Sequence, residues 1–437
     1  MKITKLMLTA MFVWCLALLP ASMLAQTSTT GTIEGTVIDA TGGVLPGVTV
    51  TVASPNLILA KSAITTSDGR YRILNLPPGR YTVTAEALPG FNKSDRTDIE
   101  VNLSKASIVE LRMQPQGTTT TVEVTSSSAI LDTTSATTQT SVSTEQFSNF
   151  PTQRTVQSLF SIAPTAARSG LRDEAGRDID PSVGGASGPE NNYILDGVTT
   201  TDPAFGGSGA NIPFEFVQEV QIKTSAFGAE YGNTTGGIFN VLTKSGGNNF
   251  HGDVFTFFST KGMVRKTESF PRTGLAPNGF SEVDAGVDVG GPILRDKLWF
   301  YGALNPHRRR NFFLTQTFKD STNNKVTTPF YAGKLTYGIN QRNTLTFSTF
   351  GDYRKEEGFL FPNSGFGASP DSFAGKTERG GGNYTVRLNS AITPTFIGEF
   401  AVGIHRQRFN TIPAASVARI PVVTDNFAIL TGGRNIA

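Results

Sequence analysis

The sequence predicts a mainly β protein of several domains. Short runs in which apolar and polar residues alternate recur along most of the chain, separated by turn residues. Composition agrees, because 46 glycines among 437 residues disfavour long helices, while 31 phenylalanines suit strands. At roughly 100–200 residues per domain, this length predicts about three domains.

Charge and reactive residues argue against several functional classes. The 38 basic and 35 acidic side chains leave a formal charge of +3, which gives no electrostatic reason to expect a nucleic-acid partner. Three histidines and one cysteine leave little material for a zinc site or a thiol enzyme, and no Ser–His–Asp set can be argued. We therefore expect a protein that is not an enzyme and that uses no cofactor or metal.

Residues 1–25 are predicted to be a secretory signal peptide. Lys2 and Lys5 form a basic start, residues 6–19 form an apolar stretch that a proline ends, and small residues lead to a cleavage point after Ala25. An uncleaved membrane anchor is the alternative. Beyond this segment no run reaches the roughly 20 apolar residues of a spanning helix, so a mature chain that enters a membrane must do so as a β-barrel.

Residues 31–114 predict a small β-sandwich. The alternating runs in this segment lie at 32–38, 47–52, 70–73, 81–85 and 107–113. The string DGRYRILNLPPGRYTVTAEALPGF, which begins at Asp68, resembles the carboxypeptidase regulatory-like domain, a transthyretin-like sandwich that is classed with carbohydrate-binding-like folds. No His-x-x-Glu zinc pair is present here, so the resemblance implies no peptidase activity.

Residues 117–125 form a predicted linker that ends in a segment suited to pairing with a partner. The segment consists of Thr121, Val122, Glu123, Val124 and Thr125. A β-branched extended run of this kind can add a strand to the edge of another protein's sheet. An ordinary linker strand is the alternative. Because of its position before the next domain, the run resembles a TonB box, and this implies a contact with TonB and its ExbB–ExbD motor.

Residues 126–247 predict an α+β domain, with short helices expected near 143–147 and 154–162. Three characteristic strings follow: NNYILDGV at 191–198, EFVQEVQI at 215–222 and AEYGNTTGGIFNVLTKSG at 229–246. Together and in this order they resemble the plug domain of TonB-dependent receptors. An Arg-Gly pair that many plugs carry upstream is absent, which leaves any role of that pair in doubt.

A glycine-rich loop between two of the plug strings is the predicted substrate-facing part of the domain. The loop runs from Phe205 to Ile212, and it lacks the strand–turn–helix context of a nucleotide-binding fingerprint. The candidate contact residues are Phe205, Gly206, Gly207, Ser208, Gly209 and Asn211.

Residues 248–437 predict the first part, about seven strands, of an antiparallel transmembrane β-barrel. Tight turns at 294–297, 340–343 and 393–394 alternate with predicted long loops at 260–281, 306–327 and 354–379, which is the layout of outer-membrane barrels. Within the runs, apolar positions alternate with polar ones, as in Val287-Asp288-Val289. A soluble sandwich is the alternative explanation of this alternation.

The barrel segment also contains a family signature. The string GPILRDKLWFYG, at 291–302, resembles the early barrel hairpin of Oar-like TonB-dependent receptors, whose domain order is sandwich, plug and barrel. The resemblance implies an outer-membrane location, with the first two domains on the periplasmic side or in the barrel lumen and the strands in contact with outer-membrane lipid. It also implies gated import of an unknown extracellular substrate, a glycan or a peptide among the candidates, without chemical catalysis.

Two expectations about the whole protein remain open at this point. Because barrels of this family have about 22 strands, about seven strands predict that the chain is the N-terminal part of a longer receptor, unable to insert and transport by itself. The alternative function is a secreted or surface protein that binds carbohydrate or mediates adhesion, with the first sandwich holding the glycan.

Overall fold

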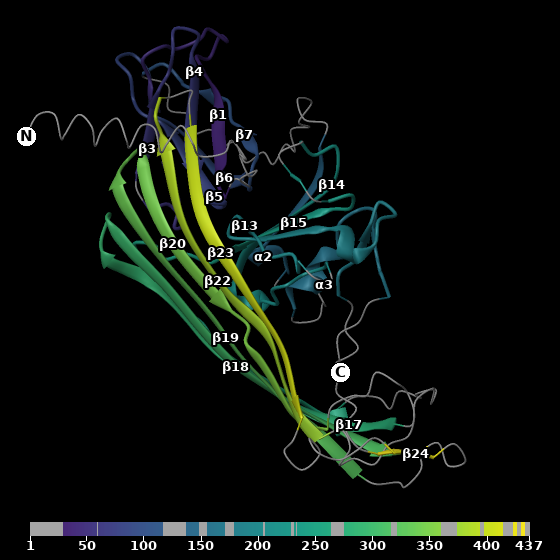
Figure 1. Ribbon diagram of the computed structural model, residues 1–437. Helices are drawn as coiled ribbons and strands as arrows, with labels where there is room; N and C mark the ends of the chain where they lie inside the picture. The colour runs from purple at the N-terminus through teal and green to yellow at the C-terminus, as the bar shows by residue number, and fades with distance from the viewer. Residues whose placement is uncertain are drawn as a thin grey trace, which may run out of the picture.

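A computed structural model of the chain shows a sandwich, a plug and a long curved sheet. Figure 1 shows the sandwich, in purple and blue, at one end of the long strands, and the plug, in teal, beside them. The structure describes residues 29–58, 60–116, 137–147, 155–170, 179–203, 206–228, 231–232, 234–263, 275–315, 321–359, 374–393, 397–413, 423–425 and 430–432.

The sandwich packs two sheets around one apolar core. One sheet has the order β4-β1-β7, with β8 also paired to β1, and the other has the order β3-β2-β5-β6. Val37, Val83 and Leu111 are among the fully buried side chains between them. The strands are β1 (Gly31–Ile38), β2 (Thr49–Ala53), β3 (Lys61–Ile64), β4 (Arg70–Leu76), β5 (Gly79–Ala85), β6 (Ser94–Val101), β7 (Ala106–Ile108) and β8 (Leu111–Arg112).

Two strands of the sandwich, β3 and β6, are not among the predicted runs. They are the two edges of the same sheet, and most of their side chains are exposed or half-buried. A strand that buries little has no reason to keep apolar residues at every second position, so its sequence carries a weak period-2 signal. The five predicted runs all contain strands, although the last one is split into β7 and β8.

The plug is built on a five-stranded mixed sheet with the order β13-β12-β15-β14-β9. Three aromatic rings pack together in its core. The Phe239 ring stacks on Tyr193 at 5.2 Å and contacts Phe160 at 4.4 Å, both measured between ring centroids. The elements are β9 (Thr138–Ser143), α2 (Thr144–Phe147), α3 (Val156–Phe160), β10 (Ala166–Ala167), β11 (Ser182–Val183), η1 (Gly188–Glu190), β12 (Asn192–Leu195), β13 (Val198–Thr199), η2 (Phe214–Phe216), β14 (Val217–Ser225) and β15 (Ile238–Thr243). Both predicted helices are present in shortened form.

The long sheet is antiparallel throughout and forms a wall beside the plug. Strands β20 and β21 lie end to end between β19 and β22, so the wall has seven strand positions, as predicted. Its elements are β16 (Val254–Thr260), η3 (Lys261–Met263), β17 (Leu275–Leu294), β18 (Leu298–Thr315), β19 (Ser321–Asn340), β20 (Asn343–Gly351), β21 (Arg354–Phe359), β22 (Ala374–Ala391) and β23 (Ile397–Pro413). A separate small hairpin is formed by β24 (Val423–Asp425) and β25 (Leu430–Gly432).

The prediction of three long loops in this region is partly wrong. Strands occupy much of the ranges that were expected to be loops, because β17, β18, β19 and β22 run well past their apolar portions and β21 continues the line of β20. The extensions contain many polar and charged side chains, such as Glu282, which contacts His307 at 2.7 Å and Arg309 at 2.6 Å on the neighbouring strand. They also bury some apolar side chains, Phe313 and Val326 among them. Charged, asparagine and threonine residues interrupt the apolar alternation in these extensions, so their sequence resembles a loop.

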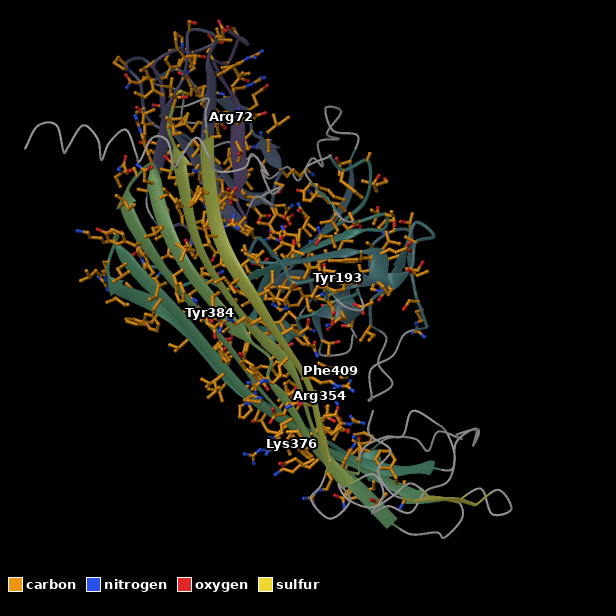
Figure 2. All side chains as sticks on the ribbon, in the orientation of Figure 1. Arg72, Tyr193, Arg354, Lys376, Tyr384 and Phe409 are labelled. Carbon is orange, nitrogen blue, oxygen red and sulfur yellow. The ribbon has the colours of Figure 1, made fainter. Side chains whose placement is uncertain are left out.

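The two faces of the wall differ as predicted. On β17, Val287 and Val289 are each 44% exposed, whereas Asp288 between them is 2% exposed and faces the plug side. Figure 2 shows Tyr384 on the outer side of the wall and Tyr193 within the plug. An exposed apolar face opposite a polar one is what a lipid-facing barrel strand requires. Among the residues that the structure describes, no helix is long and apolar enough to cross a membrane.

Candidate functional site

The plug meets the wall through a buried carboxylate at a tight turn. Asp196 lies between β12 and β13 with a φ of +47°, followed by Gly197 with a φ of +77°. Left-handed backbone favours Asp and Gly, so the LDG string forms this turn readily. The Asp196 carboxylate accepts hydrogen bonds from the Thr243 backbone N–H at 3.0 Å and from its hydroxyl at 2.7 Å.

Two cations of the wall complete this contact. Lys334 on β19 is 5% exposed, and its Nζ lies 3.1 Å from the Asp196 carboxylate and 2.8 Å from the Thr243 carbonyl oxygen. Arg387 on β22 donates to the Asp196 carbonyl oxygen at 3.0 Å and pairs with Glu399 on β23. We name Asp196, Thr243, Lys334, Arg387 and Glu399 the Asp196 clamp. Because its charges are buried and paired, opening the clamp leaves a charge without a partner, which is strongly unfavourable.

A second ion pair follows immediately along the plug chain. Lys244 comes directly after β15, and its Nζ lies 3.1 Å from the carboxylate of Asp288 on β17 and 3.3 Å from that of Asp253. Asp288 is 2% exposed, so this pair is also largely removed from water. The closing strand of the plug is therefore fixed to the wall at its last residue, Thr243, which belongs to the clamp, and at Lys244, which follows it.

The predicted substrate-facing loop contacts the wall in the part that the structure describes. Asn211 donates its backbone N–H to the carboxylate of Asp352 at 2.8 Å, and Gly207 and Gly209 are buried. Ser208 is held from the plug side, because its backbone N–H donates to the Asp180 carboxylate at 2.8 Å. Gly206 and Gly207 have φ values of +70° and +78°, which explains why glycine occupies these two positions.

Two of the predicted site segments lie outside the described residues. They are Phe205, in this loop, and the TonB-box-like segment Thr121–Thr125. A substrate contact by the loop remains a prediction, as does a TonB contact by the segment.

In the described part of the chain, the buried contact between the sandwich and the plug consists of hydrogen bonds between the sandwich backbone and plug side chains, and not of ion pairs. The Leu103 N–H donates to Glu219 Oε1 at 3.1 Å, and Gln221 Nε2 donates to the Leu103 carbonyl oxygen at 2.5 Å. Glu219 is 1% exposed, and burial raises the pKa of its carboxyl to about 7, with the nearby Glu100 acting in the same direction and the Leu103 N–H opposing it. We name Leu103, Glu219 and Gln221 the Leu103 dock.

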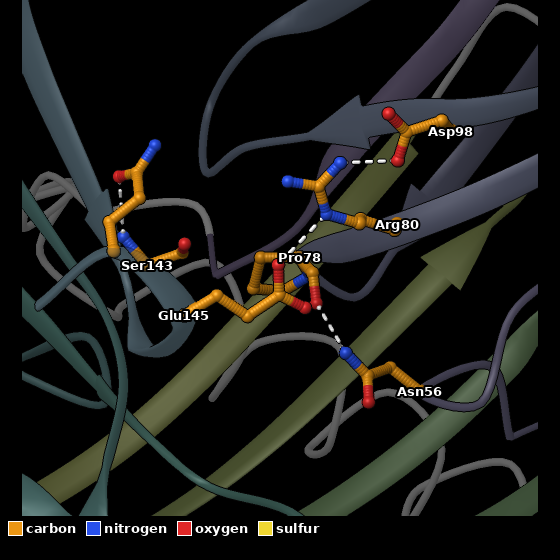
Figure 3. A network of polar contacts seen from close by, with 7 residues as sticks. Asn56, Pro78, Arg80, Asp98, Ser143 and Glu145 are labelled. Carbon is orange, nitrogen blue, oxygen red and sulfur yellow. Dashed lines mark hydrogen bonds and ion pairs between the residues drawn. The ribbon is translucent and has the colours of Figure 1, made fainter. Parts of the chain in front are cut away.

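An exposed arginine adds a weaker link between the same two domains. Figure 3 shows Arg80 of the sandwich between Asp98 of its own domain and Glu145 of the plug. The Arg80 Nε lies 2.8 Å from Glu145 Oε2, but the two side chains are 51% and 67% exposed. Exposed pairs of this kind contribute little to stability, so the Leu103 dock is the stronger part of the contact.

All three parts border one cavity. Its volume is about 370 Å³, and it is lined by residues of the sandwich loops, the end of the plug sheet and the inner face of β19, β20 and β22. Lys61, Lys244, Lys334 and Arg387 all contribute to its lining. Within the described ranges, no three His, Cys, Asp or Glu side chains come together as a metal site would need.

The sandwich, the plug and the wall each match a known protein family. Residues 32–114 match the carboxypeptidase regulatory-like domain, residues 130–238 match the TonB-dependent receptor plug domain, and residues 242–317 match an outer membrane beta barrel domain. These domains, in this order, define the class of the protein as a TonB-dependent outer-membrane receptor or transporter with an N-terminal regulatory-like domain.

Within that class the chain is a homologue of the TonB-dependent transporter Oar of Myxococcus xanthus. The two sequences are 31% identical over 419 residues, which cover 86% of this chain and 38% of the relative. The chain therefore spans well under half of the length of that relative.

Solved structures of outer-membrane receptors are also similar. The outer membrane transporter YddB from Escherichia coli matches with a TM-score of 0.48 at 16% identity, covering 61% of this chain and 38% of that one. A ferric enterobactin receptor mutant from Pseudomonas aeruginosa, in complex with enterobactin, matches with a TM-score of 0.45 at 13% identity, covering 62% and 41% of the respective chains.

The Asp196 clamp and the Leu103 dock contain residues that the sequence did not single out. Arg387 stands between the apolar residues Val386 and Leu388, as a residue on the polar face of a strand would, but its neighbours in sequence do not identify its partner. Lys334 could have been noticed as a lone charge between Gly333 and Leu335 in an otherwise uncharged strand portion. Glu219 and Gln221 belong to the EFVQEVQI string, yet nothing in that string identifies Leu103, more than one hundred residues earlier, as their partner.

Proposed function

We propose that this chain supplies the regulatory-like domain, the plug and the adjoining barrel wall of a transporter that imports an extracellular substrate with energy from TonB. The observation that supports this function best is the Asp196 clamp. A plug fixed to the inner face of the wall by buried charges closes the passage until work is done on it. The plug and barrel matches favour this function over an adhesion protein.

In this mechanism the chain performs no chemical catalysis. Substrate binds on the extracellular side, where the loop 205–212 is the candidate contact, and the segment 121–125 pairs with TonB. The ExbB–ExbD motor then supplies the force. Breaking a buried ion pair costs roughly 3–5 kcal/mol, and each 1.4 kcal/mol is a factor of about ten in population, so thermal opening at the clamp is rare and an external force is required.

The proposal is tested at the TonB contact. Val122→Pro removes a backbone N–H that strand pairing requires, so we expect the full chain carrying this change to lose capture by the purified periplasmic domain of TonB. Thr118→Pro, three residues before the segment, is the matched control, and it should be captured as the unaltered chain is.

The measurement is the amount of chain retained on immobilised TonB at increasing TonB density. Equal retention of both proline variants and the unaltered chain would contradict the proposal that residues 121–125 form the TonB contact. Absence of any retention, with the unaltered chain folded, would contradict TonB-driven transport by this protein.

A further inference from the structure

Three cations gather on one exposed part of the outer face of the wall. They are Arg308 and Arg310 on β18 and Lys325 on β19, and we name them the outer basic cluster. The two arginines share a face because they are two residues apart, and Arg310 lies directly opposite Lys325 in the strand register. Within the described ranges, no carboxylate lies at ion-pair distance from any of the three.

Two acids near the cluster have other partners. Glu282 lies on the inner face of β17, where it pairs with Arg309. Glu357 on β21 is opposite Lys325, but it forms its ion pair with Lys355 of its own strand. Like charges that face each other across neighbouring strands are destabilising, so an anion bound between the opposed cations would relieve a repulsion.

Two tyrosines locate the cluster relative to the membrane. Their hydroxyls meet above Gly382 on the outer face, because a Cβ at this glycine would lie 3.1 Å from Tyr384 Oη and 3.3 Å from Tyr353 Oη. Tyrosines are enriched where the hydrocarbon of a membrane meets water. Figure 2 shows Lys376, which belongs to the same lateral row of the wall as Arg310, farther from the sandwich than Tyr384. The cluster therefore lies beyond the tyrosines, on the side away from the tight turns.

The length of β18 gives the same height. Arg308 is ten residues beyond Leu298, the first residue of the strand after a tight turn. At about 3.4 Å per residue and a tilt of about 35–45°, these residues span roughly 25 Å across a membrane. The apolar band of outer-membrane barrels is about 25 Å tall, and their short turns face the periplasm. This places the outer basic cluster at the headgroup level of the outer leaflet.

The side chains define the chemistry of the partner. Arginine presents a planar fork of N–H donors that fits a phosphate group. Ser281 and Thr327 are the register partners of Arg310 and Arg308, and they add hydroxyl groups on the same face. A phosphate monoester carries about 1.5 to 2 negative charges at neutral pH, which suits a cluster of three cations better than the single charge of a phosphodiester.

We propose that the outer basic cluster binds a lipid headgroup that carries phosphate monoesters. The phosphate groups contact Arg308, Arg310 and Lys325, while the acyl chains lie against the apolar band below the tyrosines. The proposal uses the outer-membrane location of this class of protein and does not require TonB, so it goes beyond the proposed function.

The test is binding of diphosphoryl lipid A to the purified full chain in detergent micelles. EDTA is present, so that no divalent cation can bridge a phosphate to a carboxylate. Native mass spectrometry gives the fraction of chain with bound lipid as the lipid content of the micelles rises. We expect saturable binding, with at least fivefold weaker binding of phosphatidylglycerol, whose phosphate is a diester.

Variants of the cluster test the assignment of the residues. Arg310→Gln and Lys325→Gln should each weaken lipid A binding severalfold, and Arg310→Lys should weaken it less than Arg310→Gln does. Because these side chains are exposed, the changes should leave the fold intact. Arg295→Gln is the matched control, because Arg295 is also exposed but lies in a tight turn at the other end of the wall, and this variant should bind normally.

Each other outcome contradicts a defined part of the proposal. Absence of saturable binding, or binding that neither Arg310→Gln nor Lys325→Gln weakens, overturns it. Equally tight binding of phosphatidylglycerol overturns the assignment to a phosphate monoester. Complete displacement of lipid A by an equal concentration of inorganic phosphate overturns the assignment to a lipid. A failure of TonB capture would leave these results unchanged, so the two proposals fail separately.

Discussion

The plug has two neighbours, and it is held by them in different ways. Toward the wall, Asp196 and Lys244 form buried ion pairs with Lys334 and Asp288. Toward the sandwich, the buried contact consists of hydrogen bonds between the Leu103 backbone and two plug side chains, of which Glu219 has no cationic partner among the described residues. The first contact depends on charges that must stay paired, and the second depends on a carboxyl that can gain or lose a proton.

This difference suggests which contact yields first. A buried pair resists opening at any pH at which both groups are charged, because separation leaves a charge in a poorly solvated place. A buried carboxyl with a raised pKa, in contrast, gives a contact whose strength changes with pH near neutrality. We therefore expect the sandwich to release from the plug more readily than the plug releases from the wall.

The largest effect is expected from removal of the charge of Asp196. Asp196→Asn keeps the shape, an acceptor for Thr243 and tolerance of left-handed backbone, but it leaves Lys334 buried without its carboxylate. We expect a loss of roughly 3–5 kcal/mol in the free energy of unfolding, measured by equilibrium denaturation in detergent.

The control for this prediction is an exposed pair. Glu34→Gln breaks the contact of Glu34 with Arg72, whose side chains are 37% and 49% exposed, and it should cost less than about 1 kcal/mol. Adding Lys334→Met to Asp196→Asn should cost less than the sum of the two single changes, since the unpaired charge is then gone. Equal losses in Asp196→Asn and Glu34→Gln would contradict the role of the clamp.

The second effect is a pH dependence of the Leu103 dock. The pKa of the Glu219 carboxyl is about 7 in the folded chain and close to the ordinary glutamate value of 4.5 when exposed, so between these values the docked form keeps a proton that the undocked form releases. The dock should therefore weaken as pH rises from about 4.5 to about 7, by up to about 3 kcal/mol, and change little above that.

Chemical denaturation at a series of pH values measures this slope. Glu219→Gln still accepts a hydrogen bond from Leu103 and cannot titrate, so it should flatten the profile. Glu145→Gln changes an exposed carboxyl of the same interface and should leave the slope in place. A profile that Glu219→Gln does not alter would assign the pH dependence to another group.

The smallest effect is expected at Arg80. Arg80→Ala removes the exposed link to Glu145, and we expect a loss below about 1 kcal/mol that shrinks further at high salt. The readout is the midpoint of denaturation at low and at high ionic strength. A loss comparable to that of Asp196→Asn would mean that the exposed pair, and not the dock, holds the sandwich.

The sequence predicted those parts of the fold that local pattern determines. The alternation of apolar and polar residues located the strands of the wall. Residues such as Asp296 and Asn340 marked the tight turns that the structure contains. The sequence did not predict the strand extensions around Arg309, because polar and charged residues there interrupt the apolar period.

The candidate site was less predictable for a different reason. Lys334 and Asp196 are 138 residues apart, and Leu103 and Glu219 are 116 residues apart. Contacts of this range are determined by how whole domains pack, which no local spacing records. The positive φ of Asp196 at the LDG turn was accessible from the sequence, but its cationic partners were not.

Hydrogen exchange at two backbone amides tests the central difference most directly. The Leu103 N–H donates to Glu219 in the dock, and the Thr243 N–H donates to Asp196 in the clamp. After correction for intrinsic exchange rates, we expect the protection of Leu103 to fall between pH 5 and pH 8, while Thr243 stays protected throughout. Equal protection that does not change with pH, or loss of protection at Thr243 before Leu103, would contradict the assignment of a fixed clamp and a releasable dock.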